Sequence, residues 1–320
     1  MDFLKDFTEK INGEIMGYLP ENEPAKLYEA VKYLPAAGGK RLRPIMAMLA
    51  CEAAGGNGEN AIPFGIALEI THTFTLIHDD IMDRDEERRG MPAVHKKFGE
   101  ATAILAGDAL FAKAFEIATG TDASPEVVKT LVRNLAVMSR EICEGQQMDM
   151  GFEEADEVAE EEFLLMIEKK TAKMFEHAAM GGAIISGAGR EKQEALQNYG
   201  RNVGMAFQIW DDCLDVIGKG IGKPVGSDIR EGKKTLIFIH AMRESAEKER
   251  LAELYGKEDM TDDELDEVMD MLKRSNSLDY AKEMALRFSE TARKNLEKLE
   301  EGRAREMLEE IARFAVEREK

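Results

Sequence analysis

The chain has little of several features that would place it outside the ordinary globular proteins. It holds only 3 cysteines in 320 residues, far apart at Cys51, Cys143 and Cys213. This spacing excludes a disulfide framework and a zinc-ligand pair, so we expect three buried thiols. No apolar run approaches the roughly 18 residues of a membrane span. The opening, MDFLKDFTEKI, places Asp and Lys where a secretory signal is apolar, so we expect a cytoplasmic protein.

An excess of positive charge is also missing. The net charge of −20 argues against nucleic acid as a partner, because such binding depends on Lys and Arg that neutralise phosphates. The basic residues nevertheless bunch at five places, which are Lys40-Arg41-Arg43, Arg84-Arg88-Arg89, Lys169-Lys170-Lys173, Lys219-Lys223 and Arg230-Lys233-Lys234. Such clusters beside Asp pairs indicate a protein that binds small polyanions through its own cations and through metal ions.

Apolar residues recur at steps of three and four almost everywhere, and strand-like alternation is missing. Pro and Gly separate roughly ten or more helices joined by short loops, and Pro44 suits the first turn of one of them. There is no Gly/Ser-rich linker and no repeat. The sequence therefore predicts an all-α fold, built as a single domain over residues 1–320. The charged segment after about residue 245 is expected to form surface helices.

The most informative pattern is a pentad, DDxxD. It occurs at Asp79-Asp80-Ile81-Met82-Asp83 and at Asp211-Asp212-Cys213-Leu214-Asp215, here called the first and second pentads. On a helix the first and last Asp share a face and repel each other unless a cation lies between them. Oxygen ligands suit magnesium, which keeps open positions for substrate phosphates. A third pentad, residues 262–266, follows Thr261 among other acids, so we expect it to be a solvated helix start.

The surroundings distinguish the first two pentads. Arg88 and Arg89 follow the first, and guanidinium groups bind phosphates in bidentate pairs. A Gly-rich loop with Lys223 and Lys233 follows the second and contains no ATP-type phosphate loop. Each lysine could instead be an ordinary solvated loop charge.

Three further positions point to anion binding. In the segment GGKRLRP, Lys40 and Arg43 lie one turn apart at a helix start, where backbone N–H groups attract anions. His72 lies seven residues before Asp79 and shares its helix face, although a packing role is the alternative. The histidines at 78, 95 and 240 lack such neighbours and are assigned structural roles.

Two polar groups interrupt apolar helix faces. Gln208 precedes Asp211 on the face that leads to the second pentad. The pair Lys170-Thr171 breaks an apolar stripe, which costs stability unless it has an anionic or carbocationic partner.

Together these motifs resemble the trans-isoprenyl diphosphate synthases, the family of farnesyl and geranylgeranyl diphosphate synthases. The resemblance runs from Gly38 to Lys234 through GGKRLRP, DDIMD with RRG, the KT pair and FQIWDDCLD with its lysine loop. It implies a helical bundle around a deep central cavity, usually in a homodimer, with the two Asp motifs facing each other across the mouth. It also implies a magnesium-dependent prenyltransferase that joins isopentenyl diphosphate head-to-tail to an allylic diphosphate.

The resemblance assigns a role to each candidate residue. Two or three Mg²⁺ would be held by Asp79, Asp80, Asp83, Asp211, Asp212 and Asp215. The allylic diphosphate would meet Arg88, Lys170, Lys223 and Lys233, and isopentenyl diphosphate would meet Lys40, Arg43, His72 and Arg89. Thr171 and Gln208 would line the place where the allylic cation forms. This division is physically reasonable, because the leaving diphosphate needs metal ions and the retained one needs only positioning.

Product length rests on Phe74, five residues before Asp79 and about 7.5 Å away along the helix. Thr75, one residue later, is small. In the family this arrangement resembles archaeal-type synthases that make the C20 product, so we expect geranylgeranyl diphosphate. Farnesyl diphosphate (C15), or both products, is the alternative, and Phe74 could also be an ordinary core residue.

Other protein classes explain fewer of these residues. A terpene cyclase or squalene-synthase-like enzyme also uses Asp motifs, but the lysine loop and GGKRLRP favour the condensing enzyme. A non-catalytic regulatory subunit would be expected to lack Asp or Arg ligands, and none is missing. A plain helical scaffold leaves the ordered Lys, Arg and Gln residues unexplained.

Overall fold

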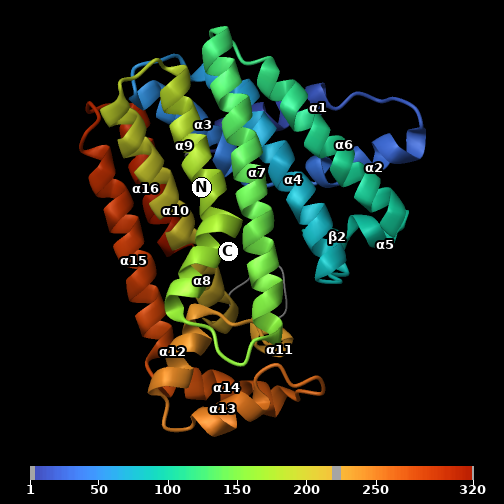
Figure 1. Ribbon diagram of the computed structural model, residues 1–320, viewed down its shortest axis with the longest axis vertical. Coiled ribbons are helices and arrows are strands. Elements are labelled where there is room, and N and C mark those ends of the chain that lie inside the picture. The colour runs from blue at the N-terminus through green and yellow to red at the C-terminus, as the bar shows by residue number, and fades with distance from the viewer. Residues whose placement is uncertain (1–3, 218–224, 319–320) are drawn as a thin grey trace. The chain divides into compact units, whose positions relative to one another are not determined.

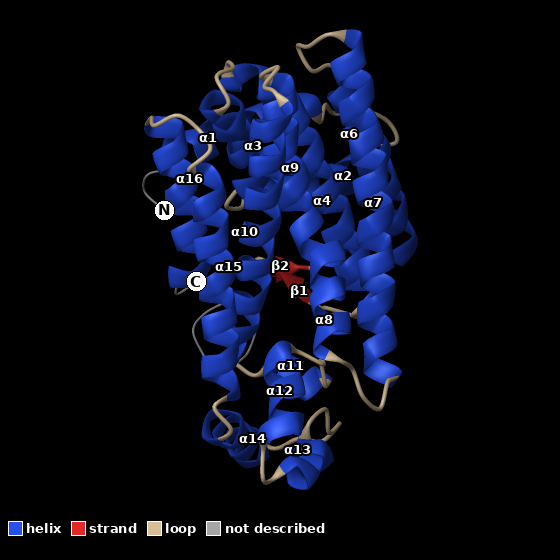
Figure 2. Cartoon of the chain, turned by 60° about the vertical axis from the view of Figure 1, so that its left-hand side comes forward, coloured by secondary structure: helices blue, strands red, loops and turns tan. Residues whose placement is uncertain are grey.

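The computed structural model describes residues 4–217 and 225–318, and most of them are helical (Figure 1). The helices are α1 (Lys5–Tyr18), α2 (Ala25–Ala36), α3 (Leu42–Ala53), η2 (Gly58–Ala61), α4 (Ile62–Met82), α5 (Val94–Phe98), α6 (Glu100–Thr119), α7 (Pro125–Glu154), α8 (Glu160–Ile167), η3 (Glu168–Ala172), α9 (Lys173–Ile185), α10 (Arg190–Ile217), α11 (Ser227–Glu231), α12 (Leu236–Glu244), α13 (Lys248–Leu254), α14 (Asp262–Arg274), α15 (Ser277–Leu296) and α16 (Arg303–Glu317). Within the described ranges the strands are limited to β1 (Glu87–Arg88) and β2 (Met91–Pro92), red in Figure 2. The predicted all-α class is confirmed. None of these helices is both long enough and apolar enough to cross a membrane.

The chain divides into two compact units. Unit 1 contains Met1–Ser139, Met174–Gln197 and Glu297–Leu308, and unit 2 contains Arg140–Lys173, Asn198–Leu296 and Glu309–Lys320. The first pentad lies in unit 1 and the second in unit 2. The description of residues 1–320 as one domain stays a prediction.

Helix α4 is the core of unit 1. It packs against α3 and α6, and the side chains of Phe64, Ile66, Leu68 and Ile70 are all fully buried. Because consecutive turns bury residues on every side, α4 is a core helix and not a surface one. The packing of these side chains holds α4 in place, and the first pentad lies at the C-terminal end of this helix.

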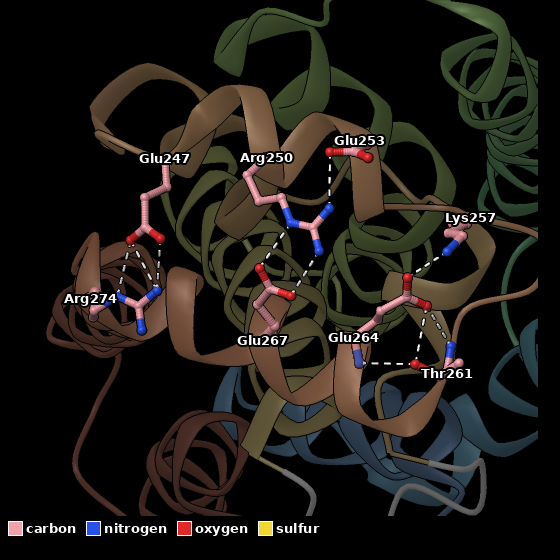
Figure 3. A network of polar contacts seen from close by, with 8 residues as sticks. All are labelled: Glu247, Arg250, Glu253, Lys257, Thr261, Glu264, Glu267 and Arg274. Carbon is pink, nitrogen blue, oxygen red and sulfur yellow. Dashed lines mark hydrogen bonds and ion pairs between the residues drawn. The ribbon is translucent and has the colours of Figure 1, made fainter.

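Helix α14 of unit 2 carries the third pentad at its start, and Figure 3 shows its polar contacts. The Thr261 hydroxyl accepts from the Glu264 N–H at 3.2 Å, and the Glu264 carboxylate accepts from the Thr261 N–H at 2.9 Å. This reciprocal pair is a capping box. The Asp262 side chain is 97% exposed and pairs with Arg230 at 2.6 Å. The predicted solvated helix start is confirmed.

The cysteine prediction holds for two thiols of three. Cys51 and Cys213 are buried, and burial raises the pKa of Cys51 to about 11. Cys143 is exposed on α7, so its predicted burial is wrong. The exposure of Cys143 could not be predicted, because an amphipathic helix accommodates Cys on either face without a change in its apolar period.

Candidate active site

Both predicted metal motifs lie at the C-terminal ends of helices. Asp83 caps α4, with its N–H donating to the Asp79 carbonyl at 2.7 Å, and the second pentad occupies the last two turns of α10. A helix C-terminus bears partial negative charge, and neither helix has a basic residue in its last turn. Carboxylates there are unfavourable without a cation. The third pentad lies at a helix N-terminus, where acidic side chains are stabilised. Its carboxylates therefore do not need a cation, unlike those of the first and second pentads.

The first pentad contains a carboxylate that is only half satisfied. Asp80 is fully buried, and its Oδ1 accepts from Arg88 Nε at 2.7 Å. Its Oδ2 has no hydrogen-bond partner among the described residues. Burial raises the pKa of Asp80, and the Arg88 guanidinium opposes that rise. Asp79 and Asp83 are partly exposed beside it. An orphaned buried oxygen next to two accessible carboxylates is a donor set that fits a hard divalent cation.

A short hairpin sends the two adjacent arginines in different directions. Strands β1 and β2 are joined by Arg89 and Gly90, with φ of +57° and +72°. Two positive φ angles in a two-residue loop are typical of a type I′ turn. Arg88, on the strand, contacts Asp80 and also pairs with Asp85 at 2.9 Å. The hairpin was missed from the sequence, because two-residue strands have no detectable period.

Arg89 belongs to a second group, here called the anion cluster: Arg43, His72 and Arg89. Arg89 donates to the Gly38 carbonyl, and a Cβ on Gly39 would lie 3.1 Å from its guanidinium. The Arg43 guanidinium lies 4.7 Å from the centre of the Phe175 ring, and burial lowers its pKa to about 10. Burial, followed by Arg43 and Arg89, lowers the pKa of His72 well below its usual value. The cluster thus offers two guanidinium groups and a neutral imidazole.

Arg41 lies between two predicted phosphate ligands yet is itself structural. Its side chain is 1% exposed and pairs with Glu69 at 2.8 Å, and it donates to Asn12 Oδ1 at 2.8 Å and the Pro35 carbonyl at 2.6 Å. Its φ of +51° is left-handed, which is rare for a residue with a side chain. Three buried contacts hold this conformation. Lys40 is partly exposed at the start of the same turn.

The second pentad is surrounded by partners of unit 2. Asp212 is buried and its Oδ1 accepts from Gln208 Nε2 at 2.9 Å. Burial, and then Asp228, raise the pKa of Asp212 well above its usual value. Asp215 Oδ1 accepts from the Ser227 N–H and hydroxyl at 3.1 and 2.8 Å, and its Oδ2 accepts from the Asp228 N–H at 3.2 Å. Asp215 therefore anchors the start of α11, and its predicted role as a metal ligand stays a prediction.

The predicted pair Lys170-Thr171 lies in a π-helical turn, η3. Thr171 Oγ1 donates to Gln208 Oε1 at 2.8 Å, which extends the chain of hydrogen bonds to Asp212. Lys170 Nζ pairs with Asp149 Oδ2 at 2.6 Å, so the expected anionic partner exists. The wider turn often marks functional sites, because it inserts one residue into the helical ladder. The sequence did not predict this turn.

Two charged neighbours of the predicted site residues were missed from the sequence. Asp149 contacts Lys170 and lies 3.9 Å from Lys233, so it holds both cations in unit 2. Arg318 pairs with Asp211 at 2.6 Å. Asp149 had no local signal, because it lies 21 residues before Lys170 and meets it only through packing. Arg318 had none, because it is more than a hundred residues from its partner.

The remaining predicted residues lie as follows. The Phe74 ring is 4.9 Å from that of Phe111 on α6 and 4.8 Å from that of His78. Thr75 Oγ1 donates to the His72 carbonyl at 2.9 Å. Lys223 lies outside the described residues.

Metal binding by the protein alone is incomplete in the described ranges. No three His, Cys, Asp or Glu side chains there gather into a full coordination set. Magnesium commonly takes one or two carboxylates and completes its shell with water and substrate phosphates. The accessible carboxylates at each pentad fit that mode of binding.

Comparison with known proteins identifies the class. Residues 24–272 match the polyprenyl synthetase family model. The chain is 47% identical over 319 residues to a geranylgeranyl pyrophosphate synthase of Geoglobus acetivorans, covering 99% of both. It is 40% identical to a geranylfarnesyl diphosphate synthase of Natronomonas pharaonis, covering 98% of this chain and 96% of that one. A crystal structure of geranylgeranyl pyrophosphate synthetase from Pyrococcus horikoshii superposes with a TM-score of 0.94 at 44% identity, covering 99% of each chain.

An all-helical chain with Asp pentads at helix ends and separate arginine groups is therefore a synthase of prenyl chains. The protein belongs to the polyprenyl synthetase family.

Proposed function

We propose that the chain condenses isopentenyl diphosphate with an allylic diphosphate, releases pyrophosphate, and makes geranylgeranyl diphosphate. Residues 1–320 would act as one synthase domain, and the carboxylates of its pentads would bind two or three Mg²⁺. Relatives named for C20 and C25 products both match over nearly the full chain, so similarity alone does not decide product length.

The supporting observation is that adjacent arginines serve different groups. Arg88 contacts the buried Asp80 of a pentad, whereas Arg89 lies with Arg43 and His72. The reaction needs two unlike diphosphate sites, because one diphosphate leaves and the other stays attached. Bound magnesium would neutralise the charge that develops on the leaving diphosphate. The anion cluster can position the retained diphosphate without activating it.

The hydrogen-bonded chain in unit 2 suits the cationic stage. The Thr171 hydroxyl and the Gln208 amide present oxygen dipoles, and Asp212 orients Gln208 through its Nε2. Lone-pair dipoles near a prenyl cation stabilise it without forming a bond. No described side chain is assigned as the base, so the departing pyrophosphate would take the proton.

The adjacent arginines provide the test. Wild-type protein is incubated with isopentenyl and dimethylallyl diphosphates and Mg²⁺, and the products are separated by chromatography. Arg88→Met should raise the KM for the allylic diphosphate, and Arg89→Met the KM for isopentenyl diphosphate, each by about 10-fold or more. Each variant is the matched control for the other.

Specific outcomes would contradict the proposal. Turnover that persists in EDTA removes the metal-dependent mechanism. Equal effects of both substitutions on both KM values remove the two-site assignment. Binding of isopentenyl diphosphate without any turnover would favour the regulatory subunit instead.

We also propose a homodimer in the cytoplasm. Helix α6 exposes two adjacent large apolar side chains, Ile104 at 40% and Leu105 at 57%. A second copy of the chain could cover them, as apolar surface patches commonly mark association sites.

A further inference from the structure

Arg318 lies just past α16, and its side chain is buried against the second pentad. The side chain is 3% exposed, and Nη2 lies 2.6 Å from Asp211 Oδ1. The guanidinium carbon lies 3.6 Å from the centre of the Phe207 ring, and Nη2 also donates to the Phe207 carbonyl at 3.0 Å. These contacts join residues more than a hundred positions apart within unit 2.

The backbone of Arg318 is held by the residue next to Asp211. Trp210 Nε1 donates to the Arg318 carbonyl at 3.1 Å. Arg318 thus contacts two consecutive residues of α10: its side chain pairs with Asp211, and its carbonyl oxygen accepts from Trp210. Trp210 is the only tryptophan of the chain. Its indole therefore reports on this contact without interference.

The Arg318–Asp211 ion pair offsets negative charge at the end of α10. Asp211, Asp212 and Asp215 stand at the negative end of α10, which has no basic residue in its own last turn. The Arg318 guanidinium, from the residue that follows α16, compensates the charge of Asp211. A divalent cation bound at Asp211 would lie close to that buried guanidinium, and like charges at close range repel each other.

We propose that Arg318 is the resident counter-ion of Asp211 and competes with divalent metal for its carboxylate. Metal binding at Asp211 then loosens the Arg318 side chain and changes the surroundings of Trp210. Arg318 is a positioning residue, since it acts through Asp211. The inference rests on the proposed function, which places metal at the second pentad.

The test measures metal binding by the full chain, apart from turnover. Isothermal calorimetry with Mg²⁺ in the presence of inorganic pyrophosphate gives the metal affinity. Arg318→Met keeps an apolar contact with Phe207 and removes the charge, so it should bind metal about 3- to 10-fold more tightly than wild type. Arg313→Met is the control, because it removes one positive charge from α16 at a side chain that is 45% exposed.

Wild-type fluorescence is a second measurement that needs no variant. Trp210 emission should change as Mg²⁺ with pyrophosphate saturates the protein. Unchanged or weaker metal binding by Arg318→Met, or a Trp210 signal indifferent to metal, overturns the proposal. Absence of metal binding in the wild type overturns the metal site of the proposed function as well, so the two failures are distinguishable.

Discussion

Side chains only two positions apart can serve different purposes when one backbone angle changes. Arg41 has a φ of +51° and is buried against Glu69, whereas Arg43 is stacked on Phe175 within the anion cluster. Arg88 and Arg89 separate in the same way across the hairpin. Neighbouring arginines thus point to different partners because their backbone angles differ.

Phe74 gives a prediction about product length. Its ring meets Phe111 of α6, so two helices contribute aromatic volume at this depth below the first pentad. Phe74→Ala should yield products at least one isoprene unit longer, because the removed ring no longer occupies the path of the chain. Chromatography of the products checks this.

The control for Phe74 is Phe98→Ala, which removes a ring that pairs with Tyr33 in the same unit. It should leave product length unchanged. An unaltered product pattern from Phe74→Ala would remove Phe74 as the residue that stops elongation.

At this scale the sequence singles out residues whose relation to one another is local. His72 and Asp79 share a helix face, and Lys170 with Thr171 breaks an apolar stripe. Arg318 and Asp149 reach their partners through tertiary packing, which no local spacing records. The left-handed φ of Arg41 also has no sequence signal, since it follows from three buried contacts made elsewhere.

At the scale of single elements, the position of a motif along its helix determines its electrostatics. The first and second pentads stand at helix C-termini and the third at an N-terminus. The sequence separated the third correctly through Thr261. Period and punctuation predicted the helical class and roughly ten or more helices but not their bounds. The π-helical turn was not predictable, since its apolar spacing differs by a single residue.

Gly145 of α7 lies directly against the π-helical turn. A Cβ at this position would collide with the backbone of Lys170. Gly145→Ala should therefore displace Lys170 and Thr171 and reduce kcat about 10- to 100-fold, because small misplacements of such groups are costly. Steady-state kinetics measures the effect.

Gly151 provides the matched control in the same helix. A Cβ there meets nothing within 4 Å, so Gly151→Ala should keep full activity and gain about 0.5–1 kcal/mol of stability. Equal behaviour of the two variants would contradict the close-contact argument.

The cap of α14 predicts an acid-sensitive element. The Glu264 carboxylate accepts hydrogen bonds from Lys257 and from the Thr261 N–H. These two contacts, the first the larger, lower the pKa of Glu264 from 4.5 to about 2. A carboxyl with a lowered pKa stabilises the folded state above its unfolded pKa and loses that effect as pH falls through its folded pKa. Urea unfolding of Glu264→Gln should therefore show a deficit at pH 6 that shrinks between pH 4.5 and about 2.

Asp263→Asn removes the same charge from the same turn and should show a smaller deficit, because the capping box stays intact. A deficit for Glu264→Gln that is independent of pH would contradict the assignment.

At the scale of the whole molecule, a net charge of −20 coexists with exposed apolar side chains on α6. Leu105→Glu should shift the solution mass from about twice 35.7 kDa to the single-chain value, because a buried carboxylate without a partner opposes association. Light scattering after gel filtration measures the mass.

Leu286→Glu on α15 is the control, since Leu286 is likewise an exposed apolar side chain, at 49%. It should leave the mass unchanged. A wild type that elutes as a single chain would remove the homodimer from the proposal.

The π-helical turn at η3 has an evolutionary consequence. One surplus residue maintains it, so loss of a single codon within 168–172 would restore an ordinary helix and rotate everything upstream by about 100°. Phe163 and Met166 would then leave the core. A change of length here should therefore disrupt both the packing of α8 and the placement of Lys170 and Thr171.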